Sequence, residues 1–368
     1  MKISGVQLTR ISVPFQHRFS HAKASRQAGD AIIICVITES GHRGFGEIQA
    51  RTYVTGEDNE PIWRQYAGDL AKRLQGLSLN SCDDIRQAMA EVGDYQIQPA
   101  LTGGFDIALH DALECYKGLD WRQIFGPKRK RPSAPCLTIG DDHDERGLIR
   151  QGRFARLSGC TAVKLKVGGH DDVARIQLLR KTIGKDIDLR LDGNGELDFN
   201  TADALLRASR DCAIHSIEEP LSKHQPELIE QLRALHTSTG VALMADESIC
   251  TEYDLERFID TGAYQWINVR VGKAGGVSGA SRLLRRALDH SFGIVCGTMV
   301  GETAVLLRIS RKLLHHCDPL AYVEGLQQGS SLLKHEPLRE VSDADLAHFE
   351  WQHDQLSQCV VSQQSIGA

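Results

Sequence analysis

Thr161-Ala-Val-Lys-Leu-Lys-Val167 is a short apolar run in which two lysines occupy alternate positions. Three similar runs follow, and each ends in a carboxylate: Leu189-Arg-Leu-Asp192, Ser216-Ile-Glu218 and Leu243-Met-Ala-Asp246. The steps from Lys166 are 26, 26 and 28 residues, close to the roughly 30 residues of one strand–helix unit. Functional side chains of a parallel barrel lie where its strands end. The spacing therefore predicts three acids that converge on one point opposite two lysines.

Strand-like runs alternate with helical stretches over most of the second part of the chain. The eight candidate strands are Pro135–Ile139, Ala162–Val167, Asp188–Leu191, Ile214–Ile217, Val241–Ala245, Trp266–Val271, Gly293–Cys296 and Ala321–Val323. This alternation is typical of a parallel sheet covered by helices. With 368 residues, the chain can hold a barrel of about 250 residues and a smaller domain. We expect an α/β protein built on a modified TIM barrel of the (β/α)7β type.

The first part of the chain has a different pattern. Its candidate strands are Ile3–Ile11, Asp30–Ser40 and Phe45–Ile48, and its clearest candidate helix is Leu101–Tyr116. A polar, proline-bounded segment at 126–132 separates it from the barrel. We expect an α+β capping domain over 1–128 and the barrel over 129–325. The C-terminal segment 326–368 is expected to return to the capping domain.

Composition excludes several classes of function. The chain is 41% apolar and 25% charged, as in ordinary globular proteins. Its net charge of −5 offers no basic surface for nucleic acid. No apolar run approaches the roughly 20 residues of a membrane helix, and the N-terminus alternates like a strand rather than a signal peptide. The ten cysteines form no CxxC pair, which is typical of reduced thiols. We expect a cytoplasmic protein without nucleic-acid or membrane partners.

The lysine and carboxylate motifs predict a metal-assisted proton transfer. Residues i and i+2 of a strand face the same side, so Lys164 and Lys166 point together into the barrel mouth. A like charge or a nearby divalent cation disfavours protonation, so both lysines are expected to have lowered pKa values and Lys166 becomes a candidate base. Carboxylates without histidine or thiol in register favour a hard cation, namely Mg²⁺. The predicted ligands are Asp192, Glu218 and Asp246, with Glu247 as an alternative to Asp246.

Taken together, these motifs resemble the enolase superfamily. The motifs are Lys164-Leu-Lys166, Asp192-Gly-Asn194, Ile217-Glu-Glu-Pro220, Ala245-Asp-Glu-Ser248 and Asn268-Val-Arg-Val-Gly-Lys-Ala-Gly-Gly276. They are most similar to the muconate lactonizing enzyme-like subgroup of the mandelate racemase/muconate lactonizing enzyme family. Gly44-Phe-Gly-Glu47 and Tyr53-Val-Thr-Gly-Glu57 resemble the capping region of that family.

The resemblance implies a reaction and a set of roles. It implies Mg²⁺-dependent removal of the proton α to the carboxylate of a small-molecule substrate, through a metal-stabilised enediolate. Lys166 would be the base, and Lys164 would contact the substrate carboxylate and tune Lys166. Residues beside the ligands would orient them; these are Asn194, Glu219, Glu247 and Asn268. We also expect a homo-oligomer.

One motif departs from the family pattern. Two-base members carry a second lysine in an Asn-x-Lys pattern, whereas this chain has Asn268-Val-Arg270. Arginine stays protonated in proteins, so Arg270 is a poor base but is well shaped to bind a carboxylate or an enolate oxygen. Alternatively it pairs with a neighbouring acid such as Glu247. Lys273 is interpreted as structural, and strand seven lacks the histidine that mandelate racemase uses.

Substrate contacts are assigned by resemblance and position. The candidates are His21, Arg51, Tyr53, Thr138, Thr298, Tyr322 and Glu324. His21, with Phe19, and Arg51 to Thr55 would lie in two loops that close over the substrate. Dipeptide epimerases carry Asp-x-Asp on the eighth strand to hold the substrate amine. The sequence Tyr322-Val-Glu324 therefore argues against a dipeptide substrate.

Four functions remain open. The enzyme could be a racemase or epimerase in which another group serves the second face. It could instead be a one-base lyase or cycloisomerase in which Lys166 removes and returns a proton on one face. A Schiff-base lyase on the same barrel would use Lys166 as a nucleophile without a metal. A catalytically idle homologue would bind only a metal or a ligand.

Overall fold

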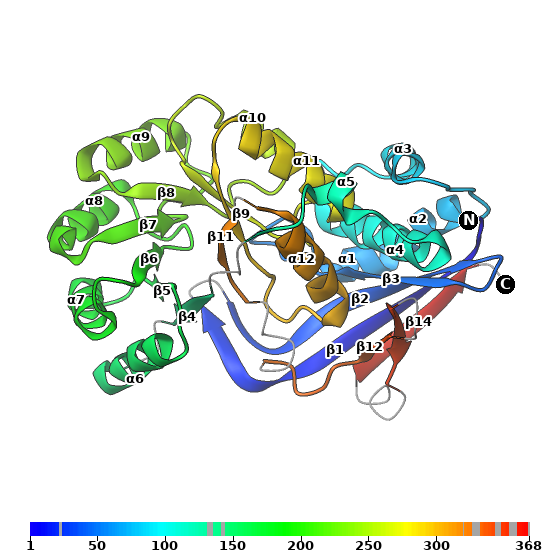
Figure 1. The fold of residues 1–368 in the computed structure, drawn as a ribbon, viewed down its shortest axis with the longest axis horizontal. Coiled ribbons are helices and arrows are strands. Elements are labelled where there is room, and N and C mark those ends of the chain that lie inside the picture. The colour runs from blue at the N-terminus through cyan, green and yellow to red at the C-terminus, as the bar shows by residue number, and fades with distance from the viewer. Residues whose placement is uncertain are drawn as a thin grey trace.

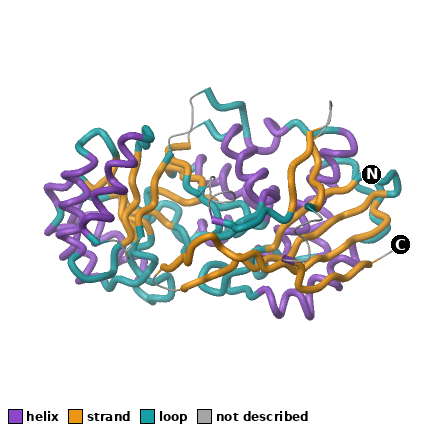
Figure 2. Tube along the Cα trace, turned by 90° about the horizontal axis from the view of Figure 1, so that it is seen from below, coloured by secondary structure: helices purple, strands orange, loops and turns teal. Residues whose placement is uncertain are grey.

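The computed structural model describes residues 1–21, 24–130, 135–140, 144–318, 320–325, 332–342, 347–352 and 359–366. It consists of a parallel barrel and an antiparallel cap that lie side by side along the long axis (Figure 1). Figure 2 shows the helices of the barrel at one end and the long strands of the cap sheet at the other. The predicted α/β architecture is therefore confirmed.

The barrel contains eight strands in chain order among the described residues. They are β4 (Cys136–Ile139), β5 (Ala162–Lys166), β6 (Asp188–Asp192), β7 (Ile214–Glu218), β8 (Ala242–Ala245), β9 (Trp266–Val269), β10 (Gly293–Cys296) and β11 (Leu320–Val323). Neighbouring strands are parallel, and a bridge between Pro135 and Val323 joins the two outer ones. All eight predicted strands are present, with ends shifted by no more than two residues.

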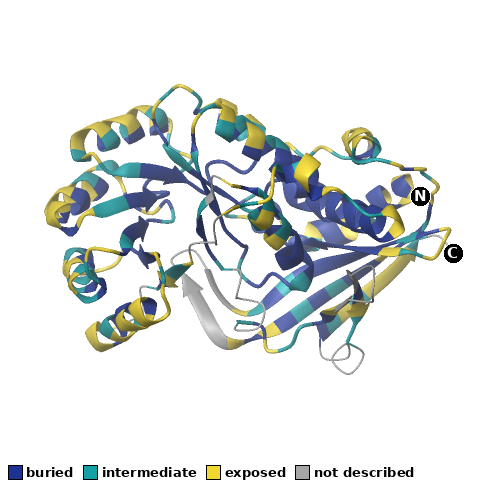
Figure 3. Cartoon of the chain, in the orientation of Figure 1, coloured by how far each residue is buried: buried dark blue, intermediate teal, exposed yellow. Residues whose placement is uncertain are grey.

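Helices connect the strands on the outside of the barrel. They are α6 (Glu145–Leu157), α7 (Asp172–Ile183), α8 (Phe199–Ala208) with the 3-10 turn η2 (Arg210–Cys212), α9 (Leu228–Thr239), α10 (Glu252–Glu256), α11 (Gly276–Asp289) and α12 (Ala304–His316). The strands are largely buried, whereas the outward faces of α6 to α9 are exposed (Figure 3). Among the described helices, none combines the length and the apolar content that a membrane span needs.

Apolar side chains fill one end of the barrel interior. Ala162, Met244, Val295 and Tyr322 form a small buried cluster there. Tyr322 reaches Asp188, the first residue of β6, so this cluster extends toward the N-terminal ends of the strands. The polar side chains near the C-terminal ends of the strands therefore have an apolar floor beneath them.

The cap sheet combines strands from both ends of the described chain. It has the order β14-β1-β2-β3 and contains β1 (Ile3–His21), β2 (Ala24–Thr38), β3 (Arg43–Ile48) and β14 (Val360–Ile366). Val6 pairs with Ile366, so β14 runs antiparallel beside β1 (Figure 1). A further hairpin is formed by β12 (Leu338–Ser342) and β13 (Ala347–Trp351). Sequence analysis had not resolved these three late strands.

Helices cover the cap sheet and join it to the barrel. They are α1 (Asn59–Pro61), the π-helix η1 (Ile62–Tyr66), α2 (Ala67–Leu74), α3 (Cys82–Val92), α4 (Pro99–Lys117) and α5 (Trp121–Phe125). The α4 helix is buried from Pro99 to Cys115. A Cβ atom at Gly46 would lie 1.9 Å from the Gly104 carbonyl oxygen, and one at Gly103 would lie 2.7 Å from the Gly276 nitrogen. Only glycine allows such close contacts. The first joins β3 to α4 within the cap, and the second joins α4 to the start of α11 and so packs the cap against the barrel.

Candidate active site

Three carboxylates from successive strands meet at the C-terminal edge of the barrel. Asp192 ends β6, Glu218 ends β7, and Asp246 directly follows β8. Asp192 is in register with both Lys166 and Glu218, which places their side chains at one level of the barrel. All three acids are buried. The structure thus places the predicted metal ligands along one edge of the barrel.

Both lysines of β5 point toward these acids, as their alternate positions predicted. The Lys164 Nζ atom lies 2.9 Å from Glu218 Oε2 and 3.5 Å from Asp192 Oδ2. The Lys166 Nζ atom donates a hydrogen bond to Asn194 Oδ1 at 2.6 Å and lies 4.0 Å from Asp192 Oδ2. Lys166 therefore has one neutral hydrogen-bond acceptor and one more distant carboxylate.

The expected pKa shift of Lys164 is wrong in direction. Burial disfavours its charged form, but Glu218, Glu324 and Asp192 outweigh burial and raise the pKa of Lys164 above its ordinary value. The reason is that its nearest neighbours are carboxylates rather than other cations. Lys164 thus remains an ammonium group that can donate hydrogen bonds but cannot serve as a base.

Arg190 is an important residue that sequence analysis missed. It is completely buried, and its guanidinium lies 3.2 Å from Glu218 Oε2 and contacts Glu324. Glu324 also accepts a hydrogen bond from Lys164 at 2.5 Å. Arg190 precedes Asp192 by two residues on β6, so strand alternation could have placed it on the same side. Lys164, Arg190, Glu218 and Glu324 form one buried ion-pair network.

The two candidates on the eighth strand have separate environments. The Tyr322 hydroxyl donates to Asp188 Oδ2 at 2.5 Å and lies 3.3 Å from His215 Nε2, so it faces the N-terminal end of the barrel. Glu324 instead has one carboxylate oxygen on Arg190 and the other on Lys164. The structure does not bring Tyr322 together with the metal-ligand candidates.

Two cations from the segment after β9 contact Asp246. Arg270 Nη2 contacts Asp246 Oδ2, and Lys273 Nζ donates to Asp246 Oδ1 at 2.8 Å and to its carbonyl oxygen. Asn268 donates to Glu218 Oε1 at 3.0 Å. The acid that Arg270 pairs with is therefore Asp246 rather than Glu247.

Glu219 shapes the loop that carries Asp246. Its φ angle of 39° is in the left-handed region, which is strained for a residue with a side chain. In this conformation Glu219 accepts hydrogen bonds from the backbone N–H groups of Asp246, at 2.8 Å, and Ser248, at 3.2 Å. Burial raises its pKa. Asn194 also has a positive φ, of 46°, directly beside Asp192.

Glu247 indicates surplus negative charge at the site. It is buried, and its Oε2 atom has no hydrogen-bond partner among the described residues. Burial, followed by the charges of Glu219 and Asp192, raises its pKa to about 7. Where neighbouring acids raise the pKa of a carboxyl group, an added cation would be stabilised.

The donor chemistry at this edge fits Mg²⁺, although the side chains are not arranged around a metal. No group of three or more His, Cys, Asp or Glu side chains in the described part of the chain surrounds a common metal position. Instead, Lys164 and Arg270 contact the oxygens of Asp192, Glu218 and Asp246. The three acids, with the unpartnered oxygen of Glu247 nearby, supply the hard oxygen donors that Mg²⁺ prefers.

The cap contributes structural contacts at the edge of the site. Arg51 is buried and donates to the carbonyl oxygens of Ala50, at 2.8 Å, and Val300, at 3.3 Å, so it ties the segment after β3 to the loop after β10. Tyr53 is partly buried and packs against an apolar cluster of Val54, Cys250 and Met299. The side chains of Phe19 and His21 lie outside the described residues.

The two threonine candidates differ in exposure. Thr138 is exposed on β4. Thr298, which follows β10, is buried, and its Oγ1 atom has no hydrogen-bond partner within the described ranges. Thr298 therefore has a buried hydroxyl whose hydrogen-bonding capacity is unused within the described residues.

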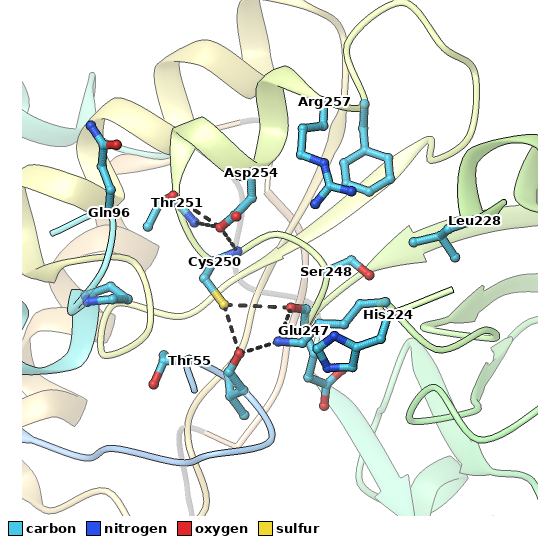
Figure 4. Close-up of a pocket in the computed structure, with 14 residues that line it drawn as sticks. Thr55, Gln96, His224, Leu228, Glu247, Ser248, Cys250, Thr251, Asp254 and Arg257 are labelled. Atoms are coloured by element: carbon cyan, nitrogen blue, oxygen red, sulfur yellow. Dashed lines mark hydrogen bonds between the residues drawn. The ribbon is translucent and has the colours of Figure 1, made fainter. Parts of the chain in front are cut away.

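A polar cavity of about 230 Å³ lies beside Glu247, between the cap and the barrel loops (Figure 4). Lys223 crosses this boundary and donates to the carbonyl oxygens of Val54, at 2.7 Å, and Glu247, at 3.2 Å. The Cys250 thiol contacts the same two carbonyls at 3.5 and 3.8 Å. Lys223 lies in an irregular loop after β7, so no sequence pattern indicated this role.

Buried acids also join the cap to α12. Glu47 on β3 accepts hydrogen bonds from the Thr303 N–H, at 3.1 Å, and hydroxyl, at 2.7 Å. Burial raises the pKa of Glu47 to about 7 and that of nearby Glu302 to about 8. A carboxyl group of the cap domain thus accepts the hydrogen bonds offered at the N-terminus of α12, a barrel helix.

Comparison with known proteins identifies a matching family and relatives that span the whole chain. The family model described as enolase C-terminal domain-like matches residues 148–348. The D-Ala-D/L-Ala epimerase of Cytophaga hutchinsonii is 28% identical over 369 residues, which cover 97% of this chain and 98% of that protein. The crystal structure of a dipeptide epimerase from the same organism, complexed with Mg and D-Ala-L-Val, has a TM-score of 0.84 with 24% identity and full coverage of both chains. The N-succinyl Arg/Lys racemase of Bacillus cereus has a TM-score of 0.86 with 24% identity and full coverage of both chains.

Proposed function

Because the chain belongs to the family of enolase C-terminal domain-like proteins, we propose that it is a Mg²⁺-dependent enzyme that removes the proton α to a substrate carboxylate. Lys166 is the base in this proposal. The observation that carries it is the environment of the Lys166 Nζ atom, 2.6 Å from Asn194 Oδ1 and 4.0 Å from Asp192 Oδ2. The base therefore lies beside the acids that would hold the metal.

Each residue of the site has a distinct role in this proposal. Bound by Asp192, Glu218 and Asp246, Mg²⁺ would withdraw electron density from the substrate carboxylate and so acidify the α-carbon. Lys166 takes the α-proton, and Asn194 orients its amino group. Lys164 remains charged because of its carboxylate neighbours and donates to the carboxylate as negative charge develops. Such preorganised donors are most effective in a buried site.

The residues expected on the substrate face opposite Lys166 favour one-base chemistry. Arg270 is a permanent cation, and Lys273 is completely buried with its amino group on Asp246. Burial lowers the pKa of Lys273, but its fully buried amino group lies against Asp246 rather than at the barrel mouth, and Arg270 keeps its proton. We therefore infer a lyase, a cycloisomerase or a proton exchange with retention, in which Lys166 acts alone.

An epimerase is the second candidate. It is supported by a relative named D-Ala-D/L-Ala epimerase that aligns with 97% of this chain. Epimerisation needs an acid on the face opposite Lys166, and that group would have to be a residue other than Arg270 or Lys273. The two candidates differ in the stereochemistry of exchange, which can be measured directly.

The network around Glu324 supports acids without a free α-amino group. Both carboxylate oxygens of Glu324 already pair with Lys164 and Arg190, so the end of the eighth strand offers no unengaged acid for an ammonium group. N-acylated and N-succinylated amino acids are therefore the first substrates to test. Dipeptides, hydroxyprolines and acid sugars complete the panel.

The test is deuterium exchange at the α-carbon in D₂O with Mg²⁺, followed by NMR and chiral chromatography. Lys166→Ala should abolish exchange on any substrate that wild type labels, while Lys181→Ala, which removes an exposed lysine of α7, should leave it unchanged. Chelation of Mg²⁺ should also stop exchange. Normal exchange in Lys166→Ala would refute the assignment of the base.

Product analysis separates the remaining alternatives. Label with retained configuration supports one-base chemistry, and label in both enantiomers supports the epimerase. Trapping of substrate on Lys166 by borohydride without Mg²⁺ would support a Schiff-base lyase. Tight Mg²⁺ binding without exchange of any acid in the panel would support a catalytically idle homologue.

A further inference from the structure

The guanidinium of Arg270 lies between two of the three carboxylates proposed to bind the metal. Its Nη2 atom contacts Asp246 Oδ2 and is 3.9 Å from Glu218 Oε1. The residue follows β9, and its side chain is 13% exposed. A cation at this position neutralises the same oxygens that a divalent metal would need.

Arg270 is anchored differently from Lys164 and Lys273. Lys164 is anchored from a different side by Glu324, and Lys273 is completely buried. By contrast, within the described part of the chain the two carboxylates that contact Arg270 are both proposed metal ligands, and its Nε atom has no hydrogen-bond partner there. Its remaining polar contact is with Met299 Sδ at 3.9 Å. Arg270 can therefore leave these acids without breaking another ion pair of the network.

We propose that Arg270 competes with Mg²⁺ for Asp246 and Glu218. In this arrangement the guanidinium stabilises the acids before the metal arrives and must move aside when it binds, so Arg270 sets the affinity of the site for Mg²⁺. Its displacement also frees a permanently charged hydrogen-bond donor at the barrel mouth. The inference rests on the proposed function only in taking Asp192, Glu218 and Asp246 as the ligands.

The experiment measures Mg²⁺ binding rather than catalysis. Protein stripped with EDTA is titrated with MgCl₂ in a calorimeter, and its thermal unfolding is followed with and without Mg²⁺. Arg270→Met should bind Mg²⁺ at least tenfold more tightly than wild type, because the guanidinium no longer competes for Asp246 Oδ2 and Glu218 Oε1. The metal-free variant should unfold at a lower temperature than wild type, because like charges are then left unneutralised, and Mg²⁺ should raise its Tm by more.

Two further variants define the cause. Arg257→Gln removes an exposed positive charge that lines the neighbouring cavity, and it should change the Mg²⁺ affinity less than twofold. Arg270→Lys retains the charge and should bind Mg²⁺ more weakly than Arg270→Met. If metal-free Arg270→Met does not fold, Arg270→Gln is purified with Mg²⁺, and the Mg²⁺ concentration that gives half of its thermal stabilisation is compared with that of wild type.

The possible failures are distinguishable. Equal or weaker Mg²⁺ binding by Arg270→Met would overturn the competition while leaving the ligand assignment intact. Identical affinities for Arg270→Lys and Arg270→Met would also overturn it, because charge would then not be the cause. An absence of Mg²⁺ binding by wild type and by every Arg270 variant would overturn the proposed function and this inference together.

Discussion

Replacing Glu324 with glutamine should destabilise the protein more than any nearby surface change. The carboxylate has one oxygen on Arg190 and the other 2.5 Å from Lys164 Nζ, and Arg190 is completely buried. A glutamine keeps the shape but loses the charge, and its NH₂ group would have to face one of the two cations. Lys164 and Arg190 would then share Glu218 as their main neutralising partner.

The magnitude follows from the burial of the network. Breaking a buried ion pair by removing one partner costs roughly 3–5 kcal/mol, because an uncompensated charge stays behind. With an unfolding entropy of about 2.1 cal/mol/K per residue, a chain of this length should lose roughly 4–6 °C in Tm if it unfolds in one step. The loss should persist at high salt, since buried pairs are weakly screened.

Differential scanning calorimetry of the two proteins checks this prediction. Glu256→Gln is the control, because its pair with Arg286 is 40–47% exposed and such pairs contribute little to stability. The double variant Arg190→Met with Glu324→Leu should be more stable than Glu324→Gln, since apolar replacement removes both charges together. A Glu324→Gln protein within about 1 °C of wild type would refute the idea that this network is tightly coupled.

Three further changes test contacts that the cap makes within itself and with the barrel. Burial raises the pKa of Glu47 from 4.5 to about 7, so the folded state binds this proton more tightly than the unfolded state. The stability that the bound proton gives to the folded state is therefore lost as the pH rises from about 4.5 through 7. Glu47→Gln should therefore gain stability relative to wild type by up to roughly 3 kcal/mol at pH 8, whereas a constant difference in urea unfolding between pH 4.5 and 8 would contradict this. Lys223→Met removes the donor to Val54 and Glu247 and should speed hydrogen exchange in residues 51–57 but not in α7; unchanged exchange would show that the loop is held by other contacts. Gly46→Ala places a Cβ atom 1.9 Å from the Gly104 carbonyl oxygen and should cost roughly 1–3 kcal/mol or more, measured as a loss of Tm relative to Gly68→Ala, whose Cβ atom would lie at an ordinary contact distance of 3.5 Å from the Gln364 side chain.

Sequence patterns predicted the barrel well because each strand carries its own evidence. A short apolar run ending in an acid indicates both a buried strand and the direction of its end, so β6 to β8 were predicted with an acid at the C-terminal end of each, whereas buried Arg190 on β6 was missed. Strand parity also placed Lys164 and Lys166 on one side. The pKa of Lys164 could not be predicted this way, because it depends on Glu218 and Glu324, which approach from other strands.

Other features depend on depth or on distant contacts. Tyr322 and Glu324 are two residues apart and face the same side, but two residues along a strand span about 6.6 Å. Tyr322 therefore lies in the apolar cluster, whereas Glu324 lies in the ion-pair network. The strand β14 has a polar, weakly alternating sequence and is defined by its partner β1. The role of Lys223 depends on where an irregular loop meets the cap, which local pattern does not encode.

The pairing of β14 with β1 affects the order in which the protein can fold. Neighbouring barrel strands are separated in the sequence by about one helix, whereas Val6 of β1 pairs with Ile366 near the other end of the described chain. Contacts so distant in sequence form slowly. Until then, one edge of the 19-residue β1 strand presents free backbone groups to solvent. Such an edge is a template for pairing with another chain. The cap is therefore the part of this molecule most exposed to misassembly during synthesis, and chaperone dependence should fall when β14 is supplied early, as in a circular permutant that places it directly before β1.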